Sequence, residues 1–146
     1  MVELGPDILN EAAQFTHYES GVNVPIEVRE FYETHWIKKE AGADDLDIDL
    51  EPFLKSSEVM TIEEAGQTVA VRVFDIEGRQ STSVTHKNYR RKGYGRAMIN
   101  ASIEYIISQS ETTPTIHLWP STKKGRKRSA AAKAEFKGRA LIVICK

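Results

Sequence analysis

The sequence contains a single cysteine, Cys145, next to its last residue. One cysteine excludes an internal disulfide framework and a zinc site built from several cysteines, and it agrees with a reducing compartment. No apolar run reaches the roughly 18–20 residues that a transmembrane helix requires. The first residues also lack the basic and apolar regions of a secretory signal. We therefore expect a cytoplasmic protein that makes no membrane contact.

Net charge is also nearly absent, at −1 over 146 residues, but the charges are unevenly distributed. Residues 1–66 hold 16 acidic and 4 basic side chains, whereas residues 67–146 hold 16 basic and 5 acidic ones. Such asymmetry indicates two surfaces that attract different partners. With 40% hydrophobic residues, the chain can bury a core, and its length predicts one domain over residues 1–146.

The spacing of apolar residues predicts helices in the first part of the chain. Residues 6–18 can form a helix that carries Phe15 on its apolar face. Residues 27–39 predict a stronger helix, because their apolar positions follow the i, i+3, i+4, i+7 pattern. The acidic stretch 41–51 is predicted to be a surface loop.

The apolar period then changes to that of β-strands. Residues 58–64, 68–76 and 80–85 are three predicted strands, rich in β-branched side chains. The pairs Ala65-Gly66 and Glu77-Gly78 separate them and are typical of tight turns. Together they predict an antiparallel meander.

Helices and strands alternate in the remainder of the chain. A helix is predicted after Gly95, followed by a strand at 115–119, a helix at 126–137 and a strand at 140–145. A helical crossover is expected to place strand 115–119 beside strand 80–85. The fold class is therefore α/β in the wider sense that includes α+β, with a mixed, mostly antiparallel sheet flanked by helices.

The most informative segment is residues 84–98, VTHKNYRRKGYGRAM. It places a strand end, a basic glycine-containing turn and a helix start in succession. The first amides of a helix lack acceptors and carry partial positive charge, and glycines let an anion approach the backbone. A diphosphate suits such a turn. The phosphate-loop motif is absent, and Met98 stands where the dinucleotide-binding fingerprint requires glycine or alanine.

Residues 90–95, RRKGYG, fit the pattern [Gln/Arg]-x-x-Gly-x-[Gly/Ala], and Tyr89 precedes them. In this motif and its position after a meander, the chain resembles the GNAT superfamily of N-acetyltransferases over roughly residues 55–122. The resemblance implies a GNAT-like acyl-CoA N-acyltransferase fold, here with an abbreviated C-terminus. Residues 1–4 are the candidate for the first strand of that fold.

The resemblance also implies an enzyme, an N-acetyltransferase with acetyl-CoA as co-substrate and no metal. An amine on a small molecule, a peptide or a protein would attack the thioester directly. Turn amides would bind the CoA diphosphate, and the preceding strand would pair with the pantetheine arm. The cofactor-binding residues that it implies are Val84, Thr85, His86, Arg90, Arg91, Lys92, Gly93, Tyr94, Gly95 and Arg96.

The attacking amine must lose a proton, so a general base is expected. By position in the implied fold, the candidates are His86 and His117, with Glu63 and Glu64 as weaker ones. Histidine has a suitable pKa for this role. Two other interpretations remain open: His117 as a hydrogen-bonded sheet residue and His86 as a solvated turn residue.

The family's usual general acid is a tyrosine on the helix after the fifth strand, and no tyrosine follows Tyr105. Ser121 is the candidate hydroxyl in its place, unless the thiolate leaves unassisted. This departure keeps a second hypothesis open, in which the chain binds CoA but serves in binding or assembly. A homodimer is also left open.

A second basic run, residues 123–128, holds five charges in six positions. Three interpretations compete for it. The run contacts CoA phosphates, or it binds nucleic acid through phosphates, or it is a solvated helix start. The nucleic-acid interpretation gives a third function class.

Overall fold

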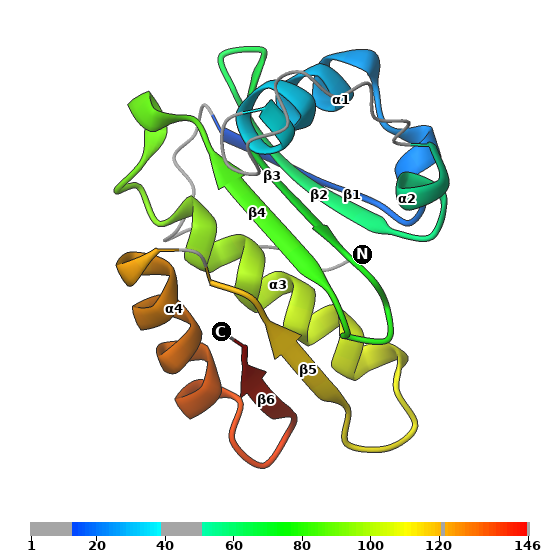
Figure 1. Ribbon diagram of the computed structural model, residues 1–146, viewed down its shortest axis with the longest axis vertical. Coiled ribbons are helices and arrows are strands. Elements are labelled where there is room, and N and C mark those ends of the chain that lie inside the picture. The colour runs from blue at the N-terminus through cyan, green and yellow to red at the C-terminus, as the bar shows by residue number, and fades with distance from the viewer. Residues whose placement is uncertain (1–12, 39–50, 121, 146) are drawn as a thin grey trace.

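The computed structural model describes residues 13–38, 51–120 and 122–145, arranged as a main sheet with helices on both faces and a smaller sheet beside it (Figure 1). The elements are β1 (Ala13–Tyr18), η1 (Gly21–Asn23), α1 (Ile26–Tyr32), η2 (Glu33–Lys38), α2 (Glu51–Lys55), β2 (Glu58–Glu64), β3 (Gln67–Phe74), β4 (Ser81–Thr85), η3 (Lys87–Tyr89), α3 (Tyr94–Gln109), β5 (Thr115–Leu118), α4 (Lys123–Glu135) and β6 (Leu141–Ile144). The predicted fold class, a mixed and mostly antiparallel sheet flanked by helices, is confirmed.

The main sheet has the order β1-β2-β3-β4, and every neighbouring pair is antiparallel. The predicted meander is therefore confirmed. Between β2 and β3, both Ala65 (φ 54°) and Gly66 (φ 78°) adopt positive φ. Two consecutive positive φ values characterise the tight hairpin turn whose twist matches that of the strands.

The prediction of a helix over residues 6–18 is wrong for its second half. Residues 13–18 form β1, which pairs with β2 from Val59 to Glu64, and residues 6–12 lie outside the described part of the chain, as do residues 1–4. Phe15 and His17 alternate with more exposed neighbours and face the core, so the segment fits a period of two. The open edge of β2 supplies hydrogen-bond partners that no local pattern reveals.

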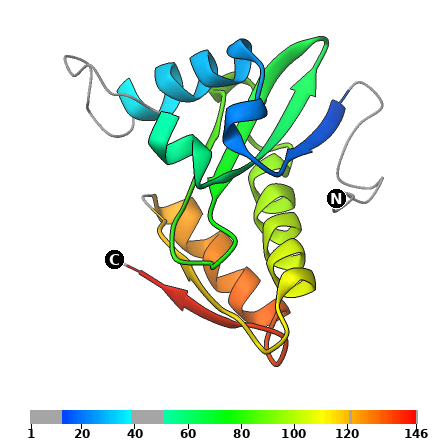
Figure 2. The same cartoon turned by 90° about the vertical axis from the view of Figure 1, so that its right-hand side faces the viewer.

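The helices cover the two faces of the main sheet. Figure 2 shows α1 and α2 on one side and α3 on the other. Val71 and Val73 of β3 pack with Val28 and Leu54 on the first face. On the second face, the buried residues of α3 pack against the sheet and against β5, β6 and α4. The helix predicted at 27–39 is confirmed as α1 and η2, and the expected loop at 41–51 lies almost entirely outside the described residues.

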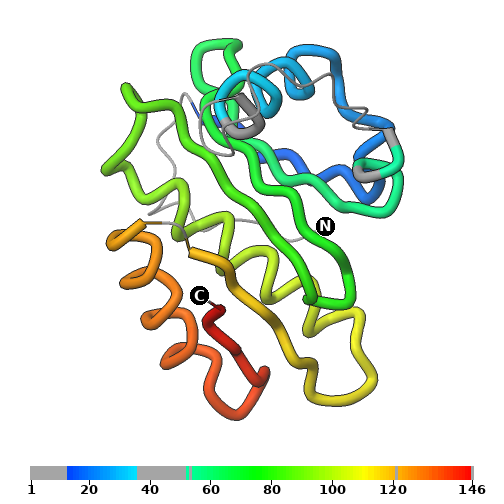
Figure 3. The backbone as a smooth tube through the Cα atoms, viewed as in Figure 1, coloured from blue at the N-terminus to red at the C-terminus, as the bar shows by residue number. Residues whose placement is uncertain are grey.

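The position of β5 agrees only in part with the prediction. It lies next to β4 but pairs in parallel with β6, in a separate sheet, and α4 makes the crossover between β5 and β6 (Figure 3). A hydrogen bond of 2.6 Å from the His117 amide to the Gly78 carbonyl holds β5 against the turn between β3 and β4. A Cβ on Gly78 would lie 2.9 Å from the carbonyl oxygen of Thr115, so the close approach requires glycine there. Among the described residues, no strand pairs with the neighbouring edge of β4.

The longer helices otherwise follow the sequence pattern. The helix predicted after Gly95 is α3, and the helix predicted at 126–137 begins three residues earlier, as α4. Within the described part of the chain, no helix has both the length and the apolar character of a membrane span.

The packing of α3 gives a test of the fold. Ile103 is fully buried in the core, whereas Ile26 in α1 is 61% exposed. We expect Ile103→Ala to lower the free energy of unfolding by about 2–5 kcal/mol, because it removes buried methyl groups and leaves a cavity. The matched change Ile26→Ala should stay within about 0.5 kcal/mol of the parent. Urea unfolding measures both, and equal losses would contradict this packing.

Candidate functional site

A cleft of about 580 Å³ lies along the unpaired edge of β4. Its walls come from β4, the turn that follows it, the first turn of α3, the end of β5 and the start of α4. Figure 1 shows the first turns of α3 and α4 on the same side of the molecule. The cleft therefore brings together both basic segments of the sequence.

The turn before α3 has a special backbone conformation. Arg91 (φ 69°) and Gly93 (φ 81°) both adopt the left-handed region, which is uncommon for a residue with a side chain. Gly93 is also the N-cap of α3, and no side chain caps the helix there. Left-handed residues at a turn orient successive amides into a concave, anion-binding arrangement. The first amides of α3 continue this arrangement.

The start of α4 presents a second set of positive groups to the same cleft. Thr122 caps this helix by accepting a hydrogen bond of 2.9 Å from the Gly125 amide. Lys123 and Lys124 follow it and line the cleft. The first turns of α3 and α4 are both within the described residues, and neither carries an acidic side chain. Basic groups at a helix N-terminus oppose the helix dipole, so an anion between these two helices would relieve the repulsion.

Arg128 of α4 approaches the start of α3. Its guanidinium lies so close to Gly95 that a Cβ on this glycine would be 2.8 Å from Nη1. Burial lowers the pKa of Arg128, and the nearby charge of Arg90 lowers it further. The second glycine of the motif thus makes room for the guanidinium of Arg128.

Glu64, at the end of β2, holds the turn against the sheet. Its carboxylate accepts hydrogen bonds from Lys92 Nζ (2.9 Å) and from the hydroxyl of Tyr94 (2.7 Å). Tyr94 is itself buried. The weaker base candidate Glu64 therefore anchors the turn before α3, and Lys92 is directed to this carboxylate instead of lining the cleft.

The free edge of β4 offers backbone groups to the cleft. The His86 amide donates to the Val69 carbonyl (2.8 Å), so alternation along an antiparallel pair turns the amides and carbonyls of Ser83 and Thr85 outward. The Thr85 carbonyl already accepts a hydrogen bond from Arg90 Nε (3.2 Å). An extended ligand in the cleft can pair with the remaining groups.

A second cavity, of about 310 Å³, adjoins the cleft. Ser81, Thr82 and Trp119 line both. Its other walls come from Ser56 and Ser57, from the last residues of β3 and from the segment that leads into β4. The two cavities therefore meet at the start of β4, where the indole of Trp119 donates a hydrogen bond to the Arg79 carbonyl (3.0 Å).

Most of the predicted cofactor-binding residues line the cleft. They are Val84, Thr85, Arg90, Arg91, Gly93, Tyr94, Gly95 and Arg96. His86 and Lys92 do not line it. Ser83 and Arg72 also line the cleft but were not predicted from the sequence. The outward direction of the Ser83 backbone groups depends on pairing with β3, and the burial of Arg72 depends on residues far away in the sequence.

The predicted catalytic residues are not brought together. The ring of His86 lies against those of His35 and Tyr89, and its Nδ1 accepts a hydrogen bond from the Asn88 amide (3.1 Å). His117 Nδ1 lies 3.6 Å from Cys145 Sγ. Neither histidine lines the cleft or the adjoining cavity.

The geometry of the cleft does not test two further expectations, the role of Ser121 and a reaction without a metal. Ser121 lies outside the described residues. Among the residues that are described, no group of three or more metal-ligating side chains gathers.

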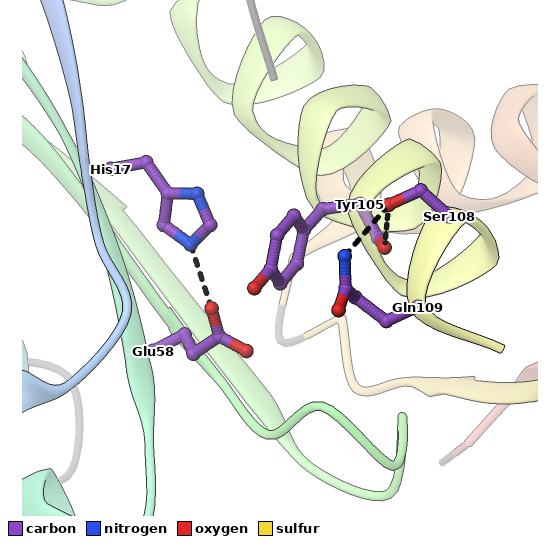
Figure 4. Close-up of polar contacts among 5 residues, drawn as sticks. All are labelled: His17, Glu58, Tyr105, Ser108 and Gln109. Atoms are coloured by element: carbon purple, nitrogen blue, oxygen red, sulfur yellow. Dashed lines mark hydrogen bonds and ion pairs between the residues drawn. The ribbon is translucent and has the colours of Figure 1, made fainter. Parts of the chain in front are cut away.

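A further polar cluster lies between β1, β2 and α3 (Figure 4). His17 Nε2 is 2.8 Å from Glu58 Oε1, and the His17 ring meets the ring of Tyr105 edge-on at 4.4 Å. Burial raises the pKa of Tyr105 to about 12, and the carboxylate of Glu58 adds to the shift. These residues line neither cavity, so the cluster joins the sheet to α3 instead of forming part of the cleft.

Comparison with known proteins gives little beyond this geometry. No family model and no curated protein matches the chain. Among solved structures, it is similar to an aminoglycoside acetyltransferase from an uncultured soil metagenomic sample, crystallised in complex with trehalose. The TM-score is 0.49 at 12% identity, and the match covers 68% of this chain and 73% of the other. At this level, neither activity nor ligand is carried over to this chain.

The role of Glu64 can be measured directly. Glu64→Gln keeps the size of the side chain but removes the charge that Lys92 and the Tyr94 hydroxyl bind. We expect a loss of about 1–2 kcal/mol in the free energy of unfolding. Glu63→Gln, one position earlier in the same strand, should change it by less than about 0.5 kcal/mol. If urea unfolding gives equal values for the two variants, Glu64 does not anchor the turn.

Proposed function

We propose that the chain binds acyl-CoA in the β4 cleft and transfers the acyl group to an amine. The observation that supports this most strongly is the convergence of two basic helix starts, whose first turns carry no acidic residue, on one cleft beside the outer edge of β4. A diphosphate attached to an extended, amide-containing arm matches both features. Acetyl-CoA is the simplest such donor.

The cleft suggests how the donor lies. The amides after Gly93 would bind the diphosphate, with Arg128, Lys123 and Lys124 around its charges. The pantetheine arm would run along β4 and pair with backbone groups of Ser83 and Thr85. The thioester would then lie toward the start of β4, where the second cavity opens.

The second cavity is the proposed entry for the acceptor. The amine nitrogen forms a bond to the thioester carbon, the carbon–sulfur bond breaks, and sulfur leaves as a thiolate. A thiol has a pKa near 8.5, so it leaves without an acid at little cost. The extra proton on nitrogen passes to water, or to His86 or His117, which remain candidates for the base. Orientation of the two reactants would supply much of the acceleration.

The other two function classes remain predictions of the sequence. A CoA-binding protein without transfer activity would use the same cleft, and only an activity measurement separates it from an enzyme. Nucleic-acid binding through residues 123–128 gains no specific support: the basic side chains of this run are exposed, and Lys123, Lys124 and Arg128 also line the cleft.

Two arginines of α4 give a matched test of the donor site. Arg128 lines the cleft, whereas Arg126, half a turn away, does not. We expect acetyl-CoA to bind the parent protein in calorimetry and Arg128→Gln to weaken binding about tenfold, which corresponds to the loss of one charge-assisted contact. Arg126→Gln should bind as the parent does. Equal weakening by both variants would indicate general attraction to a basic surface, and no binding to the parent would refute the proposal.

Transfer itself is tested by release of CoA thiol. With acetyl-CoA and a set of primary amines, the parent protein should release thiol in an amine-dependent manner. Trp119→Ala enlarges the junction between the cavities and should lower this rate while leaving the affinity for acetyl-CoA within a factor of about three. Binding without amine-dependent release for any amine would favour the binding-protein hypothesis.

A further inference from the structure

A buried cation, Arg72, lies at the inner wall of the cleft. Arg72 of β3 is only 4% exposed. Its Nε donates to the hydroxyl of Ser102 (2.8 Å) and its Nη1 to the hydroxyl of Ser83 (2.6 Å). Among the described residues, no carboxylate forms an ion pair with Arg72, and its Nη2 forms no hydrogen bond.

Such an arrangement is unfavourable in the absence of a ligand. A buried charge normally has a partner of opposite sign, and a hydrophobic side chain of similar size would fill the space at lower cost. Burial lowers the pKa of Arg72 to about 10, which leaves it charged near neutral pH. Two serine hydroxyls fix the orientation of the guanidinium without neutralising it, and Ser102 is itself held by its bond to the Ile99 carbonyl (2.8 Å).

The position of Arg72 matches the far end of a bound donor. Ser102 lies eight residues after Tyr94 along α3, or roughly 12 Å from the proposed diphosphate position. The pantetheine arm has twelve bonds between the diphosphate oxygen and the thiol sulfur, as many as the backbone of four residues. When extended it spans roughly 13 Å. Ser83, the other partner of Arg72, belongs to the strand along which the arm would run. The acyl group of a bound thioester would therefore reach the guanidinium.

We infer that Arg72 recognises a carboxylate at the end of the donor's acyl chain, so that the preferred donor is a dicarboxylic acyl-CoA. This inference rests on the proposed function. The planar guanidinium presents its free N–H groups to a carboxylate in a fixed geometry, and the ligand supplies the negative charge that the protein lacks at this position. Transfer would convert a cationic amine into an amide that bears a carboxylate.

The parent protein gives the first test, which needs no variant. Calorimetry compares free CoA, acetyl-CoA, malonyl-CoA and succinyl-CoA under the same conditions. We expect one of the two dicarboxylic thioesters to bind at least tenfold more tightly than acetyl-CoA. If acetyl-CoA binds as tightly as both of them, the inference is wrong while the proposed function stands. If no CoA compound binds, both are wrong.

Variants then assign the preference to Arg72. Arg72→Met keeps most of the volume and should abolish the preference for the dicarboxylic donor, leaving the affinity for acetyl-CoA within about threefold. Arg79 is an exposed arginine in the turn between β3 and β4, and Arg79→Met should leave the preference unchanged. If Arg72→Met does not fold, Ser83→Ala removes one orienting hydroxyl and should reduce the preference several-fold. A preference that survives in the folded Arg72→Met or Ser83→Ala protein overturns the assignment.

Discussion

Two helices begin at one cleft, and both begin with positive charge. The N-termini of α3 and α4 each carry the positive end of a helix dipole, and basic side chains surround both. Arg128 adds a guanidinium against Gly95. These groups repel one another when the cleft is empty. An anion of high charge would reverse the balance, which is why we propose a diphosphate and not a neutral ligand at this position.

The remainder of the fold creates the space that the proposed anion would occupy. β5 pairs with β6, and the bond from the His117 amide to Gly78 holds its start against the β3–β4 turn. The edge of β4 consequently stays open toward the cleft. On the other side, Glu64 binds Lys92 and Tyr94, so that the turn before α3 is tied to the end of β2. The cleft thus depends on β5 pairing with β6 and not with β4, and on the contacts of Glu64 with Lys92 and Tyr94.

Local patterns predicted the parts of the molecule that local chemistry determines. The tight turn at Ala65-Gly66 and the β-branched strands around it predict the meander, and the glycine-containing segment that ends at Gly95 predicts a turn before a helix, which the structure has. Other features depend on partners far away in sequence. β1 forms because the edge of β2 is available, and its residues also fit a helical spacing. The burial of Arg72 cannot be read from a strand that alternates valine with other residues, because it depends on Ser83 and Ser102.

In the proposed complex, the amides before and within the first turn of α3 bind the diphosphate of an acyl-CoA. Two-dimensional amide NMR during a titration with acetyl-CoA tests this binding most directly, because each backbone N–H reports separately. We predict that the largest shifts fall on Gly93 to Arg96, with a second set at Lys123 to Gly125, and that the amides of α1 stay unchanged. Largest shifts in α1, or none at saturating acetyl-CoA, would contradict it.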